Sequence, residues 1–142
     1  MGAHAALNAM QDTLEGNRKT LQQPLIAVVG PCAAGKTTLI DGLVEQGYRA
    51  RQIAQEHSYV PRMWQILTQP DILIYVDAGF ESCTERKQLN WSRTDYERQT
   101  ERLAHARQHC DIYLDTEGIS AQKALERALE ALRPLLSPET PK

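Results

Sequence analysis

The chain has 142 residues, of which 42% are hydrophobic and 24% are charged, and its formal net charge is -2. This length predicts one domain with a single core and excludes an added substrate domain. The chain has no excess of basic residues that would favour a nucleic-acid partner, and no apolar run is long enough to span a bilayer. We therefore expect a cytoplasmic protein, a monomer or homodimer, that binds neither nucleic acid nor membrane.

Both ends of the chain are predicted to lie outside the domain. Residues 1–23 mix alanine, asparagine, glutamine and charged residues with a weak helical spacing, which favours a tail or a short helix. The domain is expected to span residues 24–136. Prolines near the other end favour a tail over residues 137–142.

The stretch around which the chain is organised begins with five apolar residues, Leu25–Val29, that predict a buried strand. A loop bounded by Gly30 and Gly35 follows, and then an apolar-periodic helix that is expected to end at Gly47. The spacing of the first two glycines with the Lys-Thr pair that comes next fits the phosphate-binding loop. The strand, loop and helix supply the context that this motif requires.

The chemistry of such a loop follows from its backbone. Glycines let the chain wrap a phosphate closely, and successive N–H groups point inward beside the positive end of the helix. Lys36 is expected to reach the β- and γ-phosphates, the Thr37 hydroxyl to coordinate Mg²⁺, and Thr38 to donate to the α-phosphate. Cys32 is either a redox-sensitive thiol or a small residue that fills the loop. The residues expected to bind a nucleotide here are Gly30, Pro31, Cys32, Ala33, Ala34, Gly35, Lys36, Thr37 and Thr38.

The segment after the first helix is the most unusual in the chain. Residues 48–54 predict a short second strand, a fifth strand of the sheet could lie within residues 48–64, and Pro61 is expected to start a short helix through Leu67. Residues 55–64 gather a carboxylate, an imidazole, a guanidinium and two aromatic rings. They follow a strand end, which is where ligands bind in open α/β sheets.

Five side chains of this segment are candidates for binding a phosphoryl acceptor. Glu56 either orients the acceptor hydroxyl or the water shell of Mg²⁺, or is a surface acid. His57 either accepts a proton or binds a phosphate, or is structural. Tyr59, Arg62 and Trp64 either sandwich a base or sugar by stacking, or pack in the core.

An apolar run over residues 71–77 predicts a buried strand beside the first one. Asp77, which closes the run, either orients the acceptor and helps to hold Mg²⁺, or caps the turn to the next helix. A helix is expected over residues 80–89.

The remaining elements are one long helix, a strand and a final helix. Ser92 and Asp95 fit a capping box for a helix over residues 93–109. A last strand is predicted over residues 111–115. Ser120 is expected to cap an amphipathic helix that runs to about Leu132, before Pro134 ends the fold.

This order of elements predicts the fold class. Strands alternate with helices, which favours a mostly parallel sheet of four or five strands covered by helices on both faces. We therefore expect a single three-layer α/β/α domain.

Three pieces of the chain together resemble small P-loop kinases, the group that includes adenylate, thymidylate, shikimate and dephospho-coenzyme A kinases. The pieces are residues 30–38, residues 70–77 with the Glu-Arg-Lys triplet at 85–87, and residues 110–120. The resemblance implies the P-loop nucleoside triphosphate hydrolase fold and the cofactors ATP and Mg²⁺. It also implies transfer of the γ-phosphoryl group to a small-molecule acceptor such as a nucleoside or nucleotide.

The resemblance carries roles for further residues. Arg86 and Arg93 look like the arginines of a lid that closes over the phosphates, and Thr116 and Gly118 like the loop that passes beside the adenine. The region of residues 48–70 is shorter than its counterpart in those kinases and holds no Asp-Arg pair. The residues implied in catalysis are Lys36, Glu56, Asp77, Arg86 and Arg93, and those implied at the metal are Thr37 and Asp77.

Two other functions fit the same motif. One is a nucleoside triphosphatase or nucleotide-dependent switch, in which residues 57–64 respond to the γ-phosphate. The other is a nucleotide-binding module without turnover. A guanine-specific version of either is disfavoured, because the chain has no Asn-Lys-x-Asp element to read the base.

Overall fold

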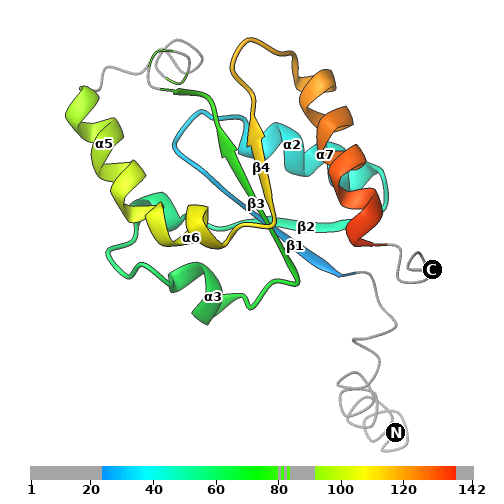
Figure 1. Cartoon of the computed structure of the whole chain (residues 1–142), viewed down its shortest axis with the longest axis horizontal. Coiled ribbons are helices and arrows are strands. Elements are labelled where there is room, and N and C mark those ends of the chain that lie inside the picture. The colour runs from blue at the N-terminus through cyan, green and yellow to red at the C-terminus, as the bar shows by residue number, and fades with distance from the viewer. Residues whose placement is uncertain (1–23, 80, 82, 84–91, 137–142) are drawn as a thin grey trace, which may run out of the picture.

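A computed structural model describes residues 24–79, 81, 83 and 92–136 of the chain (Figure 1). The predictions for both tails, for most of the helix over residues 80–89 and for Arg86 lie outside these residues. None of the helices in the described ranges is long and apolar enough to cross a membrane.

The centre of the domain is a four-stranded sheet in the order β2-β1-β3-β4, in which all neighbouring strands are parallel. Its strands are β1 (Leu25–Val29), β2 (Arg49–Gln52), β3 (Ile72–Asp77) and β4 (Ile112–Asp115). The central strands β1 and β3 are almost wholly buried, as their apolar runs predict. The edge strand β2 carries exposed arginine and glutamine side chains, which discourage pairing with another sheet.

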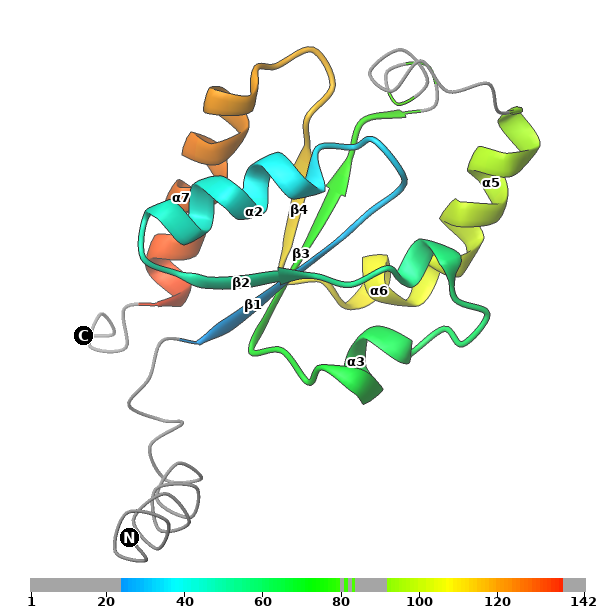
Figure 2. The ribbon, with the colours of Figure 1, turned by 180° about the vertical axis from the view of Figure 1, so that it is seen from behind.

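Helices pack against both faces of this sheet (Figures 1 and 2). Alternate strand residues face opposite sides, so Ile26 and Ile74 join one core cluster while Ala27 and Tyr75 join another. The first cluster lies under α2 (Lys36–Glu45) and α7 (Ala121–Leu135), and the second under α3 (Met63–Leu67) and α6 (Ala104–His109). The chain is thus an α/β domain with a four-stranded parallel sheet, an arrangement compatible with three layers.

Several local signals in the sequence are confirmed. Gly47 follows the end of α2 with a φ of 97°, a value that suits glycine. Ser92 and Asp95 form the expected capping box of α5 (Arg93–Arg102), with each side chain bonded to the other residue's N–H. The Ser120 hydroxyl accepts the N–H of Lys123 at the start of α7.

Other boundaries were predicted wrongly. The second strand is shorter than residues 48–54, and η1 (Gln55–His57), a turn of 3-10 helix, follows it in place of any fifth strand within residues 48–64. The short third helix begins at Met63 and not at Pro61. In both places the backbone is held by the buried Gln55 side chain, which binds the N–H of Trp64 and the carbonyl of Val60.

The last two helices also differ from the prediction. The helix over residues 93–109 is interrupted at Leu103, between α5 and α6, because the Gln55 amide takes the carbonyl of Arg102 as its acceptor. The final helix runs on to Leu135 with Pro134 inside it. The helix continues past Leu132 because its apolar face also continues. Leu132 is fully buried, and Leu136 packs against the same core.

Parallel strands bring the segments that follow their carboxyl ends to one edge of the sheet. Three of these segments matter below: the loop over residues 30–35 after β1, η1 after β2, and the turn over residues 116–120 after β4. The loop after β1 leads to α2 on one face, whereas the segment after β3 leads to α5 and α6 on the other (Figure 1). Such a divergence opens a crevice at the carboxyl edge, where ligands bind in α/β sheets.

Candidate nucleotide-binding site

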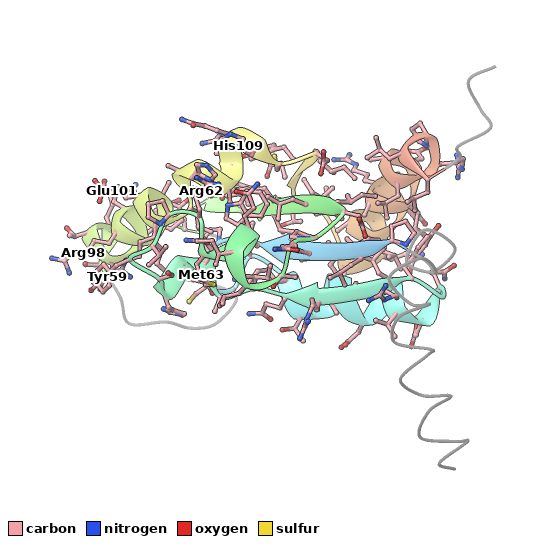
Figure 3. The ribbon with its side chains drawn as sticks, turned by 90° about the horizontal axis from the view of Figure 1, so that it is seen from below. Tyr59, Arg62, Met63, Arg98, Glu101 and His109 are labelled. Atoms are coloured by element: carbon pink, nitrogen blue, oxygen red, sulfur yellow. The ribbon has the colours of Figure 1, made fainter. Side chains whose placement is uncertain are left out.

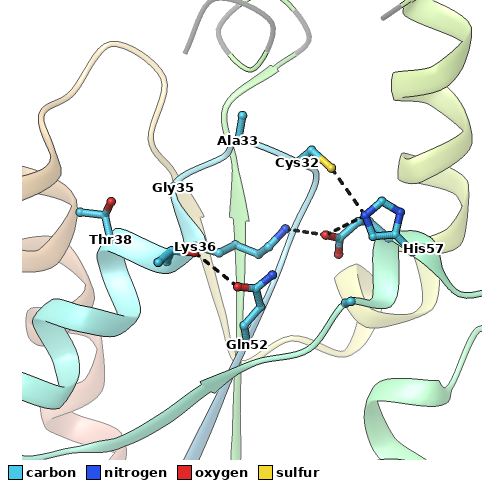
Figure 4. Close-up of a pocket in the computed structure, with 10 residues that line it drawn as sticks. Cys32, Ala33, Gly35, Lys36, Thr38, Gln52 and His57 are labelled. Atoms are coloured by element: carbon cyan, nitrogen blue, oxygen red, sulfur yellow. Dashed lines mark hydrogen bonds and ion pairs between the residues drawn. The ribbon is translucent and has the colours of Figure 1, made fainter. Parts of the chain in front are cut away.

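A cavity of about 460 Å³ lies at this edge, between the 30–35 loop and the end of β2 (Figure 4). Its walls come from two separate parts of the sequence. The loop and α2 contribute Cys32, Ala33, Gly35, Lys36, Thr37 and Thr38, and β2 with η1 contributes Gln52, Ala54, Glu56 and His57.

The backbone conformation of the 30–35 loop depends on its two glycines. A Cβ on Gly30 would lie 2.2 Å from the carbonyl oxygen of Val76 on β3, so only glycine lets the two strands approach here. Gly35, at the start of α2, has a φ of 105°. Ala33 takes a left-handed φ of 66° in the same turn.

The start of α2 offers unpaired donors to the cavity. Within the part of the chain that the structure describes, the N–H groups of Gly35, Lys36, Thr37 and Thr38 meet no acceptor. The first N–H groups of a helix have no partner inside the helix, and the helix dipole adds positive charge there. The loop therefore presents several donors to a ligand that carries negative charge.

Lys36 is a buried cation in the floor of this cavity (Figure 4). Its ammonium donates to the carbonyls of Gly30 and Pro31 and lies 3.0 Å from Oε2 of Glu56, whose side chain is also buried. Burial of both charges is costly, so the pair depends on its close geometry. Oε1 of Glu56 has no hydrogen-bond partner in the described part of the chain, which leaves a buried acceptor available.

Glu56 is held in place by a network that the sequence did not reveal. The Gln55 side chain is fully buried, and its amide joins η1 to Val60 and to the carbonyl of Arg102. The Arg102 guanidinium in turn donates to the carbonyl of Glu56, at 3.2 Å. These bonds turn the Glu56 carboxylate toward Lys36.

Gln99 is a second residue that sequence reasoning missed. From α5 it accepts the N–H of Cys32 at 2.9 Å and donates to the Cys32 sulfur at 3.2 Å. It thereby fixes the loop from a helix 67 residues away in sequence. No motif marks it, because it stands in a run of charged and polar residues. Gln52, whose Oε1 lies 3.5 Å from the Thr37 hydroxyl, was also not singled out.

A second, smaller cavity of about 190 Å³ adjoins the first and shares Gly35 and Thr38 with it. Most of its other lining residues are small or apolar. The Thr116 hydroxyl, predicted to lie beside a base, donates to the carbonyl of Ala34 at 3.0 Å and so joins this turn to the loop. Gly118 belongs to the same turn, with a φ of 75°, but is not among the residues that line the cavity.

Asp77 does not line either of these cavities. Its carboxylate accepts the Tyr113 hydroxyl at 2.8 Å, the Tyr96 hydroxyl at 3.4 Å and the N–H of Gly79 at 3.2 Å. Burial, with the Asp77 hydrogen bond and charge, raises the pKa of Tyr113 to about 12. Burial and the same carboxylate raise the pKa of Tyr96 to about 12. The hydrogen bond from the N–H of Gly79 agrees with the alternative in which Asp77 caps the turn after β3.

The other candidates for acceptor binding are dispersed. Trp64 is buried in the core, where its indole N–H donates to Nδ1 of His105, so the core-packing interpretation describes it. Tyr59 and Arg62, both labelled in Figure 3, line other surface hollows. The Arg102 guanidinium lies over the Tyr59 ring, 4.5 Å from its centroid. Arg93 is exposed at the start of α5 and does not line the 460 Å³ cavity. Of the five candidates for acceptor binding, only Glu56 and His57 line the 460 Å³ cavity together with the 30–35 loop.

No model of a protein family matches the chain, and no curated protein matches it.

Proposed function

We propose that this chain binds ATP at the 30–35 loop and transfers its γ-phosphoryl group to a small hydroxyl- or phosphate-bearing molecule. The observation that carries this proposal is the buried Lys36 ammonium at the start of α2, which lies 3.0 Å from the buried Glu56 carboxylate in the lining of a cavity. Such a loop, preceded by a strand and followed by a helix, has the form of a P-loop.

The residues fit ATP in two adjoining volumes. The 460 Å³ cavity holds the donors and the cation that a triphosphate needs, and the 190 Å³ cavity beside Thr116 has the small, apolar lining that suits a base. Gly35 and Thr38 stand at the boundary between the two. The exposed Thr37 hydroxyl would hold Mg²⁺ together with phosphate oxygens, and that ion would supply neutralising charge.

Lys36 and Glu56 would change partners when the nucleotide enters. The γ-phosphate offers Lys36 several acceptor oxygens, which replace the Glu56 carboxylate as its ionic partner. Glu56, with Oε1 already unpaired, would then accept a hydrogen bond from the attacking hydroxyl and position it in line. His57, which lines the same wall, is the other group placed to meet the acceptor.

Water is the second candidate acceptor, which makes the chain a nucleoside triphosphatase. The observation in its favour is that Tyr59, Arg62 and Trp64 do not line the cavity, so few groups remain to recognise an organic acceptor. Glu56 could orient a water molecule in the same way as a hydroxyl.

One assay separates these functions. The full chain is incubated with ATP and Mg²⁺, with and without a panel of nucleosides, nucleotides and sugars, and ADP is measured. ADP that depends on one acceptor supports the kinase, ADP without acceptor supports the triphosphatase, and ATP binding without ADP formation contradicts both.

The variants test the site itself. Lys36→Ala is expected to abolish ATP binding, while Lys123→Ala, which removes an exposed lysine on α7, is the matched control and should bind as the parent does. Thr37→Ala alters an exposed side chain and should weaken binding only when Mg²⁺ is present. Unchanged ATP affinity in both Lys36→Ala and Thr37→Ala would overturn the proposal.

A further inference from the structure

Three metal-binding side chains of different kinds line the 460 Å³ cavity close to one another. A thiol from Cys32, a carboxylate from Glu56 and an imidazole from His57 each place one ligand atom within 4.8 Å of the other two. They come from the 30–35 loop and from η1, segments that meet only in the folded chain (Figure 4). We propose that these three residues form a binding site for a transition-metal ion, for which Zn²⁺ is the best match.

The spacing fits the coordination distances of zinc. Ligand bonds of about 2.0–2.3 Å in a tetrahedral site put sulfur, nitrogen and oxygen about 3.4–3.6 Å from one another. Nε2 of His57 lies 3.7 Å from the Cys32 sulfur and 3.7 Å from Oε2 of Glu56. The Cys32 sulfur lies within 4.8 Å of the Glu56 ligand oxygen, so the side chains would have to rotate to close the three atoms around one ion.

A second observation points to a cation. Glu56 is 2% exposed, and its Oε1 has no hydrogen-bond partner among the described residues. A buried carboxylate oxygen without a donor costs free energy, which a metal ion at that oxygen would recover. A carboxylate has about four acceptor sites, so Lys36 can keep one on Oε2 while the ion binds the carboxylate through Oε2 and the unpaired Oε1.

The surroundings of Cys32 suit a thiolate ligand. The Gln99 amide already donates to its sulfur at 3.2 Å, as supporting groups do around metal thiolates. On binding, the thiol proton passes to solvent and the sulfur donates an electron pair to the ion, which sheds water in exchange. Sulfur, nitrogen and oxygen together select Zn²⁺, or Co²⁺ in its place, over Mg²⁺.

Three protein ligands leave one position of a tetrahedral ion open, and here that position would face the cavity. Sites of this form hold a water molecule or a substrate oxygen in the fourth position. The site does not depend on the proposed function, because its ligands would bind the ion whether or not the 30–35 loop binds a nucleotide.

Titration of the reduced, metal-free full chain with Co²⁺ tests the proposal. We expect a thiolate-to-cobalt charge-transfer band that saturates at one ion per chain and disappears when Zn²⁺ is added. Cys32→Ser should abolish the band, and His57→Asn and Glu56→Gln should each weaken Co²⁺ binding by about tenfold or more. Zn²⁺ should also raise the thermal unfolding temperature of the parent, because it binds only the folded site.

Cys110→Ser is the matched control. Cys110 is a half-buried thiol near two other histidines, His105 and His109, and lies on a different part of the surface. Its removal should leave the band unchanged. The proposal is overturned by the absence of a band at millimolar Co²⁺, by a band that survives in Cys32→Ser, or by one that is lost in Cys110→Ser. Failure of ATP to bind, with the band intact, would overturn the proposed function and leave the metal site standing.

Discussion

The buried pair of Lys36 and Glu56 yields a prediction in which the two partners are not equivalent. Lys36 has three acceptors, namely the Glu56 carboxylate and the carbonyls of Gly30 and Pro31. Among the described residues Glu56 has one ionic partner within hydrogen-bond distance, Lys36, and the exposed His57 ring is 3.7 Å away. Removal of the lysine should therefore cost more stability than removal of the carboxylate charge.

The magnitudes follow from burial. Lys36→Met leaves a carboxylate that is 2% exposed without its cation, which is expected to lower the free energy of unfolding by about 3–5 kcal/mol. Glu56→Gln keeps the shape and leaves Lys36 bonded to two carbonyls, so its cost should be smaller, about 1–3 kcal/mol. In the double variant no buried carboxylate is left uncompensated, and it should be more stable than Lys36→Met alone.

Urea unfolding followed by circular dichroism, on the parent, both single variants and the double variant, measures these differences as a double-mutant cycle. Lys123→Met is the control, since Lys123 and its partner Glu126 are both exposed and should contribute less than about 1 kcal/mol. The reasoning is refuted if Lys36→Met unfolds at the same urea concentration as the parent, or if the effects of the two single variants simply add.

Three further predictions concern the backbone and the titrating groups. Gly30→Ala should lower the free energy of unfolding by about 3 kcal/mol or more, since the new Cβ meets the Val76 backbone carbonyl at 2.2 Å. Gly47→Ala, with a φ of 97° but open space around it, should cost only the left-handed strain of about 1–2 kcal/mol, and an equal loss in both would contradict the steric argument. Burial, with the charges of His109 and Arg62, lowers the pKa of His105 below 6.5, so the unfolded chain binds a proton that the folded chain resists. The free energy of unfolding should therefore fall as pH drops through about 6.5, and His105→Asn should reduce that slope in urea unfolding at a series of pH values. Asp77→Asn should bring the pKa of Tyr113 down from about 12 toward the ordinary 10, although burial keeps part of the shift. Ultraviolet titration of tyrosinate, with Tyr113→Phe to identify that residue, measures it, and an unchanged titration would show that the carboxylate charge contributes nothing.

Signals that lie close together in sequence predicted their structures well. The apolar runs at Leu25–Val29 and Ile72–Asp77 form the two central strands, and the Ser92 and Ser120 caps start their helices where expected. Each of these signals acts through residues a few positions apart. They therefore need no knowledge of the rest of the fold.

The errors come from contacts between distant residues. The interruption at Leu103 depends on Gln55, which lies 47 positions before the carbonyl that it binds. The role of Gln99 at the loop depends on Cys32, 67 positions away. Neither glutamine belongs to a local sequence pattern, so the sequence did not indicate these two contacts.

The two carboxylates considered for catalysis illustrate the same limit. Glu56 comes shortly after β2 and Asp77 is the last residue of β3, and the carboxyl ends of both strands lie at the same edge of the sheet. The sequence therefore made both residues candidates for the same role. Their surroundings separate them. Asp77 meets the hydroxyls of Tyr96 and Tyr113, donors that stabilise the carboxylate where it is. Glu56 lies beside the Lys36 ammonium in the lining of a cavity, and one of its oxygens has no donor within the described ranges of the chain. A buried acceptor without a donor is available to bind a ligand. The candidate site should therefore depend on Glu56 for its chemistry and on Asp77 only for the packing of the neighbouring helix.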